Sequence, residues 1–325
     1  MQDKGFEVYY DSLTEANWFS SLHPAFDIMS PKNRYEIIKR RGSNPQIIED
    51  ITAYDKPDII LLQDGKPLLV IEITSEVPTG HNVGQRFARL VRAIELGIPT
   101  IYFFPFDAKK HGEYAGMCNM NARLLLAAKN IYTIHKTPLM CVDWITDSDG
   151  EIITDGSEDA HIKSMLASYV SSGFSKQCKG FVDQLADMDA EYARRVATRP
   201  SYKEMPNSVS KMPTSAFIRA YRIDTSKVDD DFINRPFTYI YTMDMTPANC
   251  KRQDPYTGMT FIYDYVLCRN GADVSEKSNN LVLRFPSLTK RIWHANNPND
   301  PNTKSCNWYL TANMLLYLDD FDFLR

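Results

Sequence analysis

The sequence predicts an α/β fold, a mixed sheet flanked by helices, followed by a second domain of the α+β class. Two apolar runs rich in β-branched residues, at 57–62 and 67–74, are separated by the turn dipeptide Asp64-Gly65. Such a pattern predicts a β-hairpin. Apolar residues then recur at helical spacing over 82–96, and another buried strand is predicted at 98–106. Strands that alternate with helices are typical of α/β architectures.

The remaining elements of the first domain are predicted from the same patterns. In chain order we expect a short basic helix at 31–41, the hairpin, the helix at 82–96 ended by Gly97 and Pro99, the strand at 98–106, a helix at 119–129 and a strand at 138–145.

An acidic, turn-rich segment at 145–160 predicts a domain boundary, so we expect one domain at 1–157 and a second at 158–325. The second domain is predicted to contain helices at about 158–172 and 176–196, a loop at 199–215, strands at 237–245, 259–268 and 280–285, and a last helix at about 307–318.

Composition excludes several classes of protein. Apolar residues make up 43% and aromatic residues 12%, which favours packed cores over disorder, and the net charge of −4 confines any nucleic-acid binding to local basic patches. Neither a signal peptide nor a membrane span is expected. The six cysteines are scattered without a CxxC pair, which suits reduced thiols in a cytoplasmic protein. No P-loop, GxGxxG or GxSxG motif is present.

The predicted hairpin brings two carboxylates together. If residues 64–66 form a three-residue loop, Gln63 pairs with Pro67 and Asp58 lies opposite Glu72. Opposed residues share a face of the sheet, with Cβ atoms about 4.5–5.5 Å apart. Because two carboxylates so close repel each other, they need a cation between them, and their hard oxygen atoms suit Mg²⁺ or Mn²⁺.

Both carboxylates also have simpler explanations. Asp58 could serve only to start a strand, since Pro-Asp is a common turn dipeptide. Glu72 is harder to explain in this way, because it interrupts the apolar run LLVIEIT, which predicts a strand buried on both faces. A carboxylate at such a position is costly unless it is paired or binds a metal ion.

The pattern of Asp58, Glu72 and Thr74, a PD dipeptide followed by ExT, resembles the PD-(D/E)xK nuclease superfamily, which includes many restriction endonucleases and repair nucleases. The resemblance covers about 30–106 and implies a restriction-endonuclease-like fold with Asp58 and Glu72 as catalytic metal ligands. It also implies a lysine where this chain has Thr74. A threonine hydroxyl cannot replace an ammonium charge, so another group must orient the attacking water, or the metal alone must activate it.

The helix after the hairpin offers candidates for that role. Gln85, Arg89 and Arg92 are predicted to form one face, with Arg86 adjacent. The resemblance implies a catalytic role for Gln85, and the arginines are predicted to contact DNA phosphates; the alternative is a solvated helix face. There are three further candidate site residues. His81 and Glu76 follow the hairpin and could instead be ordinary loop residues. Glu36 is suggested by the resemblance as an acid on the N-terminal helix.

A basic segment at 192–222 is a candidate surface for the DNA backbone. Its cations are Arg194, Arg195, Arg199, Lys203, Lys211, Arg219 and Arg222, interleaved with four aromatic residues. Arg194 and Arg195 are the predicted DNA-binding pair. The alternative is a polar linker with ordinary surface charge.

Together these patterns predict a Mg²⁺- or Mn²⁺-dependent DNA endonuclease of the restriction or phage-defence type, with DNA as partner and a homodimer as one oligomeric state to test. The alternatives are a non-catalytic nucleic-acid-binding module or a nuclease subunit of a larger complex. The sequence leaves the choice between DNA and RNA open.

Overall fold

The computed structural model describes residues 5–27, 33–38, 40, 42–78, 86–113, 115–200, 209–243, 245–247, 279–296 and 307–325. The chain divides into two compact units, Met1–Asn82 with Arg89–Lys203, and Val83–Ala88 with Glu204–Arg325. The first unit therefore continues past the predicted boundary between 157 and 158. Two helices that the sequence had assigned to the second domain, α7 (Ala160–Ser171) and α8 (Lys179–Thr198), belong to it.

The first unit is built on a six-stranded mixed sheet in the order β2-β1-β3-β4-β5-β8. The strands are β1 (Phe6–Tyr10), β2 (Arg34–Glu36), β3 (Ile59–Gln63), β4 (Lys66–Ile73), β5 (Thr100–Phe104) and β8 (Leu139–Asp143). β3 runs antiparallel to both of its neighbours, whereas β4, β5 and β8 are parallel. The predicted hairpin and the two predicted strands that follow it are confirmed.

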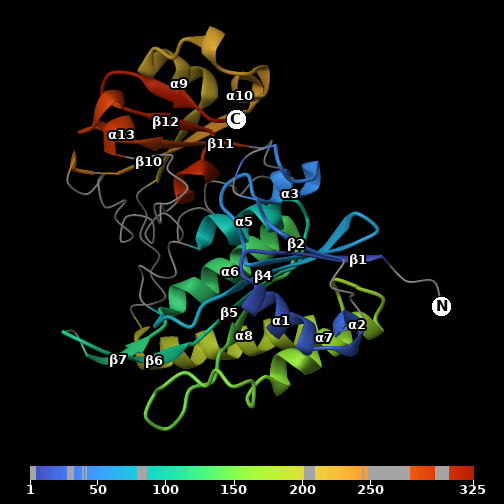
Figure 1. Cartoon of the computed structure of the whole chain (residues 1–325). Helices are drawn as coiled ribbons and strands as arrows, with labels where there is room; N and C mark the ends of the chain where they lie inside the picture. Colours follow the sequence, from blue (N-terminus) through green and yellow to red (C-terminus); the bar gives the residue numbers. More distant parts are fainter. Residues whose placement is uncertain are drawn as a thin grey trace. The chain divides into compact units, whose positions relative to one another are not determined.

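Helices cover both faces of this sheet (Figure 1). α5 (Phe87–Glu95) connects β4 to β5, and α6 (Ala122–His135) connects β5 to β8. Right-handed crossovers between parallel strands place both helices on one face. α1 (Leu13–Ser21), α7 and α8 lie on the other face. The predicted mixed sheet flanked by helices is confirmed at this level.

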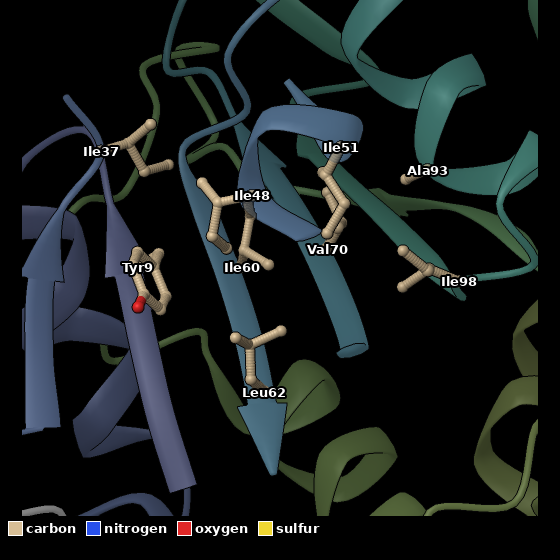
Figure 2. Packing of buried hydrophobic residues seen from close by; sticks show 9 residues of the cluster. All are labelled: Tyr9, Ile37, Ile48, Ile51, Ile60, Leu62, Val70, Ala93 and Ile98. Atoms are coloured by element: carbon tan, nitrogen blue, oxygen red, sulfur yellow. The ribbon is translucent and has the colours of Figure 1, made fainter. Parts of the chain in front are cut away.

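A core of branched aliphatic side chains fixes the face that carries α5. Ile48 and Ile51 of α3 (Gln46–Ile51) pack against Ile60 and Val70 of the sheet, and all four are fully buried (Figure 2). Each such side chain contributes about 1.5–3 kcal/mol when removed from water. Because β3 and β4 are both anchored by this cluster, their alternation between the two faces is fixed as well.

The predicted basic helix at 31–41 is wrong at its centre, where Arg34–Glu36 form the edge strand β2. β2 pairs in parallel with β1, and the rings of Tyr9 and Tyr35 stack with centroids 5.0 Å apart. The next residue, Ile37, is buried in the aliphatic core. These contacts are long-range, so local helix propensity did not decide the conformation.

Several elements of the first unit were missed by the sequence prediction. They include β1, α1, α2 (Pro24–Asp27), α3 and the small hairpin of β6 (Asp107–Lys110) and β7 (Gly116–Asn119). The predicted helices at 119–129, 158–172 and 176–196 correspond to α6, α7 and α8, although α6 extends to His135.

The hairpin closes through two residues, not the predicted three. Gln63 pairs with Lys66, and both turn residues have positive φ, 50° at Asp64 and 70° at Gly65, as in a type I′ turn. A bulge between Leu61 and Leu62 then shifts the pairing by one residue. Since Ile59 pairs with Ile71, continuing the register places Asp58 opposite Glu72, the predicted arrangement.

The second unit contains a five-stranded sheet in the order β13-β12-β11-β10-β9. Its strands are β9 (Val209–Pro213), β10 (Phe237–Thr242), β11 (Asn279–Arg284), β12 (Met314–Leu316) and β13 (Phe321–Phe323), and its helices include α9 (Thr214–Tyr221), α10 (Asp230–Asn234) and α13 (Lys290–Asn296). β10, β11 and β12 are parallel, and both edge strands are antiparallel.

Two of the predicted strands of this unit, at 237–245 and 280–285, are confirmed by β10 and β11, and the third, at 259–268, lies outside the described residues. The predicted last helix at 307–318 is wrong, because a short 3-10 helix (Asn307–Thr311) is followed by strand β12. Met314 packs into the core with Phe217 and Val282, which explains why this segment is extended. None of the described helices is long and apolar enough to cross a membrane.

The hairpin turn yields a prediction for stability. Gly65→Ala should lower the free energy of unfolding by about 1–2 kcal/mol, since a Cβ atom is strained at positive φ. Asp64→Asn is the control and should change it by less than about 0.5 kcal/mol, because asparagine tolerates this conformation. Urea denaturation measures both, and equal midpoints for the two variants would contradict the type I′ turn.

Candidate active site

Asp58 and Glu72 are buried side by side at one edge of the first sheet. Asp58 immediately precedes β3, and Glu72 is the penultimate residue of the antiparallel β4, so both lie where β4 ends. Asp58 is 6% exposed and Glu72 is 0% exposed. The Oδ2 atom of Asp58 accepts a hydrogen bond of 2.6 Å from the backbone N–H of Ile73. The predicted juxtaposition is therefore present in the structure.

The guanidinium of Arg89, in the first turn of α5, provides the positive charge between these carboxylates. Its Nη1 lies 2.8 Å from Oε1 of Glu72 and 3.9 Å from Oδ1 of Asp58, and its Nε lies 2.7 Å from Oδ2 of Asp55. Burial by itself lowers the pKa of Arg89, but the three carboxylates, Glu72 foremost, raise it well above the ordinary value. Arg89 was predicted to face DNA; the structure instead places it among the acids.

Glu15 is a further acidic residue near Asp58, and the sequence prediction missed it. Its Oε2 atom is buried and has no hydrogen-bond partner in the part of the chain that the structure describes. Burial, followed by the charges of Asp58 and Asp11, raises the pKa of Glu15 to about 7. Glu15 lies in the first turn of α1, a helix that was not predicted, so no pattern in the sequence singled it out.

Glu36, the sequence candidate for an acid on the N-terminal helix, does not have that position. It is exposed and lies on the edge strand β2. The residue of an N-terminal helix that approaches Asp58 is Glu15.

Lys56 adds a second positive charge next to these acids. Its Nζ forms an ion pair with Oδ1 of Asp11, and its side chain is 16% exposed. Lys56 and Arg89 both partly offset the rise in the pKa of Glu15. The short segment before β3 thus supplies the site with Asp55, Lys56 and Asp58.

Thr74 is buried just beyond the end of β4 and has a structural role there. Its backbone N–H donates to the carbonyl of Phe103 at 3.0 Å, which continues the pairing with β5. Its hydroxyl accepts from the backbone N–H of Glu76 at 3.2 Å. Gln85 and His81, two other predicted site residues, lie outside the described residues.

The other predicted DNA contacts of α5 are placed differently. Arg92 donates from Nε to the carbonyl of Asp50 at 2.9 Å, and its guanidinium lies over the ring of Tyr54, 5.2 Å from the centroid. These contacts attach α5 to α3, so the structure gives Arg92 a packing role. Arg86 is half-buried immediately before α5.

The predicted DNA-binding pair at the end of α8 separates into two different environments. Arg195 is only 7% exposed and bonds the carbonyl of Met120 and the carboxylate of Asp107, each at 2.8 Å. Its prediction as a DNA contact is therefore corrected, because a buried, fully bonded guanidinium cannot reach a phosphate. Arg194 is 64% exposed and pairs with Glu191 at 2.6 Å, so its contact with DNA stays a prediction.

The acidic side chains at this edge of the sheet are potential ligands of a divalent cation. Within the described residues, no group of three or more His, Cys, Asp or Glu side chains gathers closely enough to hold a metal ion. Mg²⁺ requires fewer protein ligands, because it keeps several waters and is commonly bound by one or two carboxylates together with substrate phosphates. Asp58 and Glu72 fit that requirement.

No protein-family model, curated protein or solved structure matches this chain significantly. Any functional assignment must therefore rest on the chemistry of the residues themselves.

The ion-pair cluster yields the second prediction. Arg89→Ala should lower the free energy of unfolding by about 3–5 kcal/mol, because it leaves the buried carboxylate of Glu72 without its nearest cation. Adding Glu72→Gln to this variant should recover part of the loss. Chemical denaturation at pH 8 measures both, with Arg194→Ala as an exposed control; a stability of Arg89→Ala equal to that of the control would refute the role of Arg89.

The raised pKa of Glu15 yields the third prediction. Folding favours the protonated carboxyl, so the contribution of Glu15 to stability is present below its ordinary pKa of 4.5 and is lost as the pH rises through about 7. Glu15→Gln should therefore stabilise the protein at pH 8 and have little effect at pH 4.5. Melting temperatures over this pH range measure the difference, and a benefit that does not depend on pH would contradict the assignment.

Proposed function

We propose that the first unit is a divalent-metal-dependent nuclease that hydrolyses phosphodiester bonds in DNA. The observation that carries the proposal is the pair of buried carboxylates, Asp58 and Glu72, on one face at one edge of the sheet. Placing two acids there is costly, and packing alone gives no reason for both of them. A site that binds a cation gives a reason for both acids.

Asp58 and Glu72 are the residues that would hold Mg²⁺ or Mn²⁺. When bound, such an ion lowers the pKa of a coordinated water and neutralises charge on the scissile phosphate. The hydrogen bond from Ile73 keeps Asp58 oriented, and the position of Glu72 within β4 fixes its backbone.

Arg89 has two functions in this proposal. Without a metal ion it supplies positive charge to the two carboxylates, at 2.8 Å from Glu72 and 3.9 Å from Asp58. If a bound cation neutralised the carboxylates of Asp58 and Glu72, the guanidinium of Arg89 would be able to turn to a phosphate oxygen. A phosphate suits the planar array of donors on a guanidinium. The bond to Asp55 would keep it at this edge throughout.

Glu15 and Lys56 also support the proposal. A carboxyl group with a pKa of about 7 can accept or donate a proton near neutral pH. Lys56 supplies an ammonium charge next to Glu15 and Asp11, although it stands before Asp58 and not at the position of Thr74. These two residues are candidates for orienting the attacking water.

One observation favours the alternative of a non-catalytic nucleic-acid-binding module. Arg89 already donates to one oxygen of Glu72 and to Asp55 at hydrogen-bond distance, so both acids have a cationic partner without a metal ion. The two proposals differ in whether a divalent ion binds to the folded protein. We also propose a role in restriction or phage defence and recognition of DNA by the second unit. Assembly as a homodimer or as a subunit of a larger complex is a further proposal.

The fourth prediction tests catalysis. The protein should cut plasmid DNA in the presence of Mg²⁺, and Asp58→Asn or Glu72→Gln should reduce the rate at least about a hundredfold, in line with losing one group that stabilises developing charge. Asp183→Asn, an exposed acid on α8, is the control and should cut normally.

A companion measurement separates the two proposals. Mg²⁺ should raise the melting temperature of the wild-type protein and not that of Glu72→Gln, since an ion that binds only the folded state stabilises it. No cleavage together with no Mg²⁺-dependent shift would favour the non-catalytic binding module. Undiminished cleavage by both carboxylate variants would show that the site lies elsewhere.

A further inference from the structure

A cavity of about 580 Å³ lies beside the proposed catalytic edge. It is lined by residues from three segments, 75–77 after β4, 109–111 at the end of β6, and 150–154 after β8. All three segments follow the carboxyl ends of the parallel strands β4, β5 and β8. Ligands of open α/β sheets bind in the crevice outside these strand ends, and the volume is within the usual range for a bound small molecule, about 300–1,000 Å³.

The lining combines cationic donors with acceptors and two apolar side chains. Lys109, Lys110 and His111 carry the donors, Glu76 and Glu151 are the acids, and Val77 and Ile152 are the apolar residues. Such a mixture suits a ligand that has both an anionic group and a flat, hydrogen-bonding group.

Glu151 organises the basic side of the cavity. Its Oε2 lies 2.9 Å from Nε2 of His111, and its Oε1 lies 3.6 Å from Nζ of Lys109. The hydrogen bond from His111 holds the pKa of Glu151 below its ordinary value. The backbone N–H of Lys109 also donates to the carbonyl of Gly150 at 2.9 Å. The two segments that carry these charges are therefore tied together.

The spacing connects this cavity to the carboxylate pair. Ser75 is three residues beyond Glu72, so it lies at most about 11 Å from it, since an extended chain spans no more than about 3.6 Å per residue. The bases of a DNA strand are about 3.4 Å apart along the helix axis. A strand whose phosphate lies at Glu72 would therefore bring a nucleotide within about three steps of the cleaved bond to the cavity.

We propose that this cavity is a substrate-strand subsite that takes one nucleotide of DNA within about three steps of the cleaved bond. Lys109 and Lys110 supply positive charge for the phosphates of this strand, and Val77 and Ile152 contact the base. This inference rests on the proposed function, since it names where the strand lies when its phosphate reaches Asp58 and Glu72.

The fifth prediction tests this subsite by DNA binding without cleavage. Lys109→Gln/Lys110→Gln keeps the aliphatic stems and removes two charges. Its affinity for a short fluorescein-labelled duplex of mixed sequence, measured by fluorescence anisotropy in EDTA, should fall about tenfold or more. The slope of log affinity against log salt should flatten by about one to two, one unit for each lost phosphate contact.

The control variant is Lys129→Gln/Lys179→Gln, which removes two charges from exposed, ion-paired lysines of α6 and α8. It should keep the wild-type slope. If the wild type cuts plasmid DNA and the cavity variant binds with the same affinity and slope as this control, the subsite is refuted and the proposed function stands. If the wild type neither binds nor cuts DNA, the proposed function fails, and this inference fails with it.

Discussion

The ion pair between Arg89 and Glu72 is the interaction on which the site depends. Glu72 is fully buried in β4, and burying a carboxylate without a counterion costs several kcal/mol. Arg89 supplies that counterion from α5, while its bond to Asp55 reaches the segment before β3. One guanidinium therefore joins three consecutive parts of the fold: the segment that enters the hairpin, the strand that leaves it, and the helix that follows.

The direction of the strands explains why the functional groups gather at one edge. β4, β5 and β8 are parallel, so their carboxyl ends coincide, and the antiparallel β3 begins at the same edge with Asp58 before it. Chain segments that follow these strands can carry polar side chains into a common space, as the segments 75–77, 109–111 and 150–154 do around the cavity.

Pairing within the hairpin was predictable because it is local, and its geometry depends on few residues. Asp64-Gly65 specified a turn, and the alternation of apolar residues specified the faces. The predicted loop length was one residue too long, yet the bulge between Leu61 and Leu62 restored the register that opposes Asp58 and Glu72. Glu15 was not predictable in this way. It comes to Asp58 from more than forty residues earlier in the chain, on a helix with no distinctive pattern.

By itself, the sequence determined the α/β class of the first unit, the hairpin and the opposition of Asp58 and Glu72, because periodicity and turn chemistry act over a few residues. Only the tertiary structure decided the charge partners. It turned Arg89 inward to the acids, committed Arg92 and Arg195 to packing, made Arg34–Glu36 a strand, and brought Glu15 and Lys56 to the site. The physical reason is that the free energy of a charged side chain depends on which opposite charges and how much water surround it, and those neighbours come from distant parts of the chain.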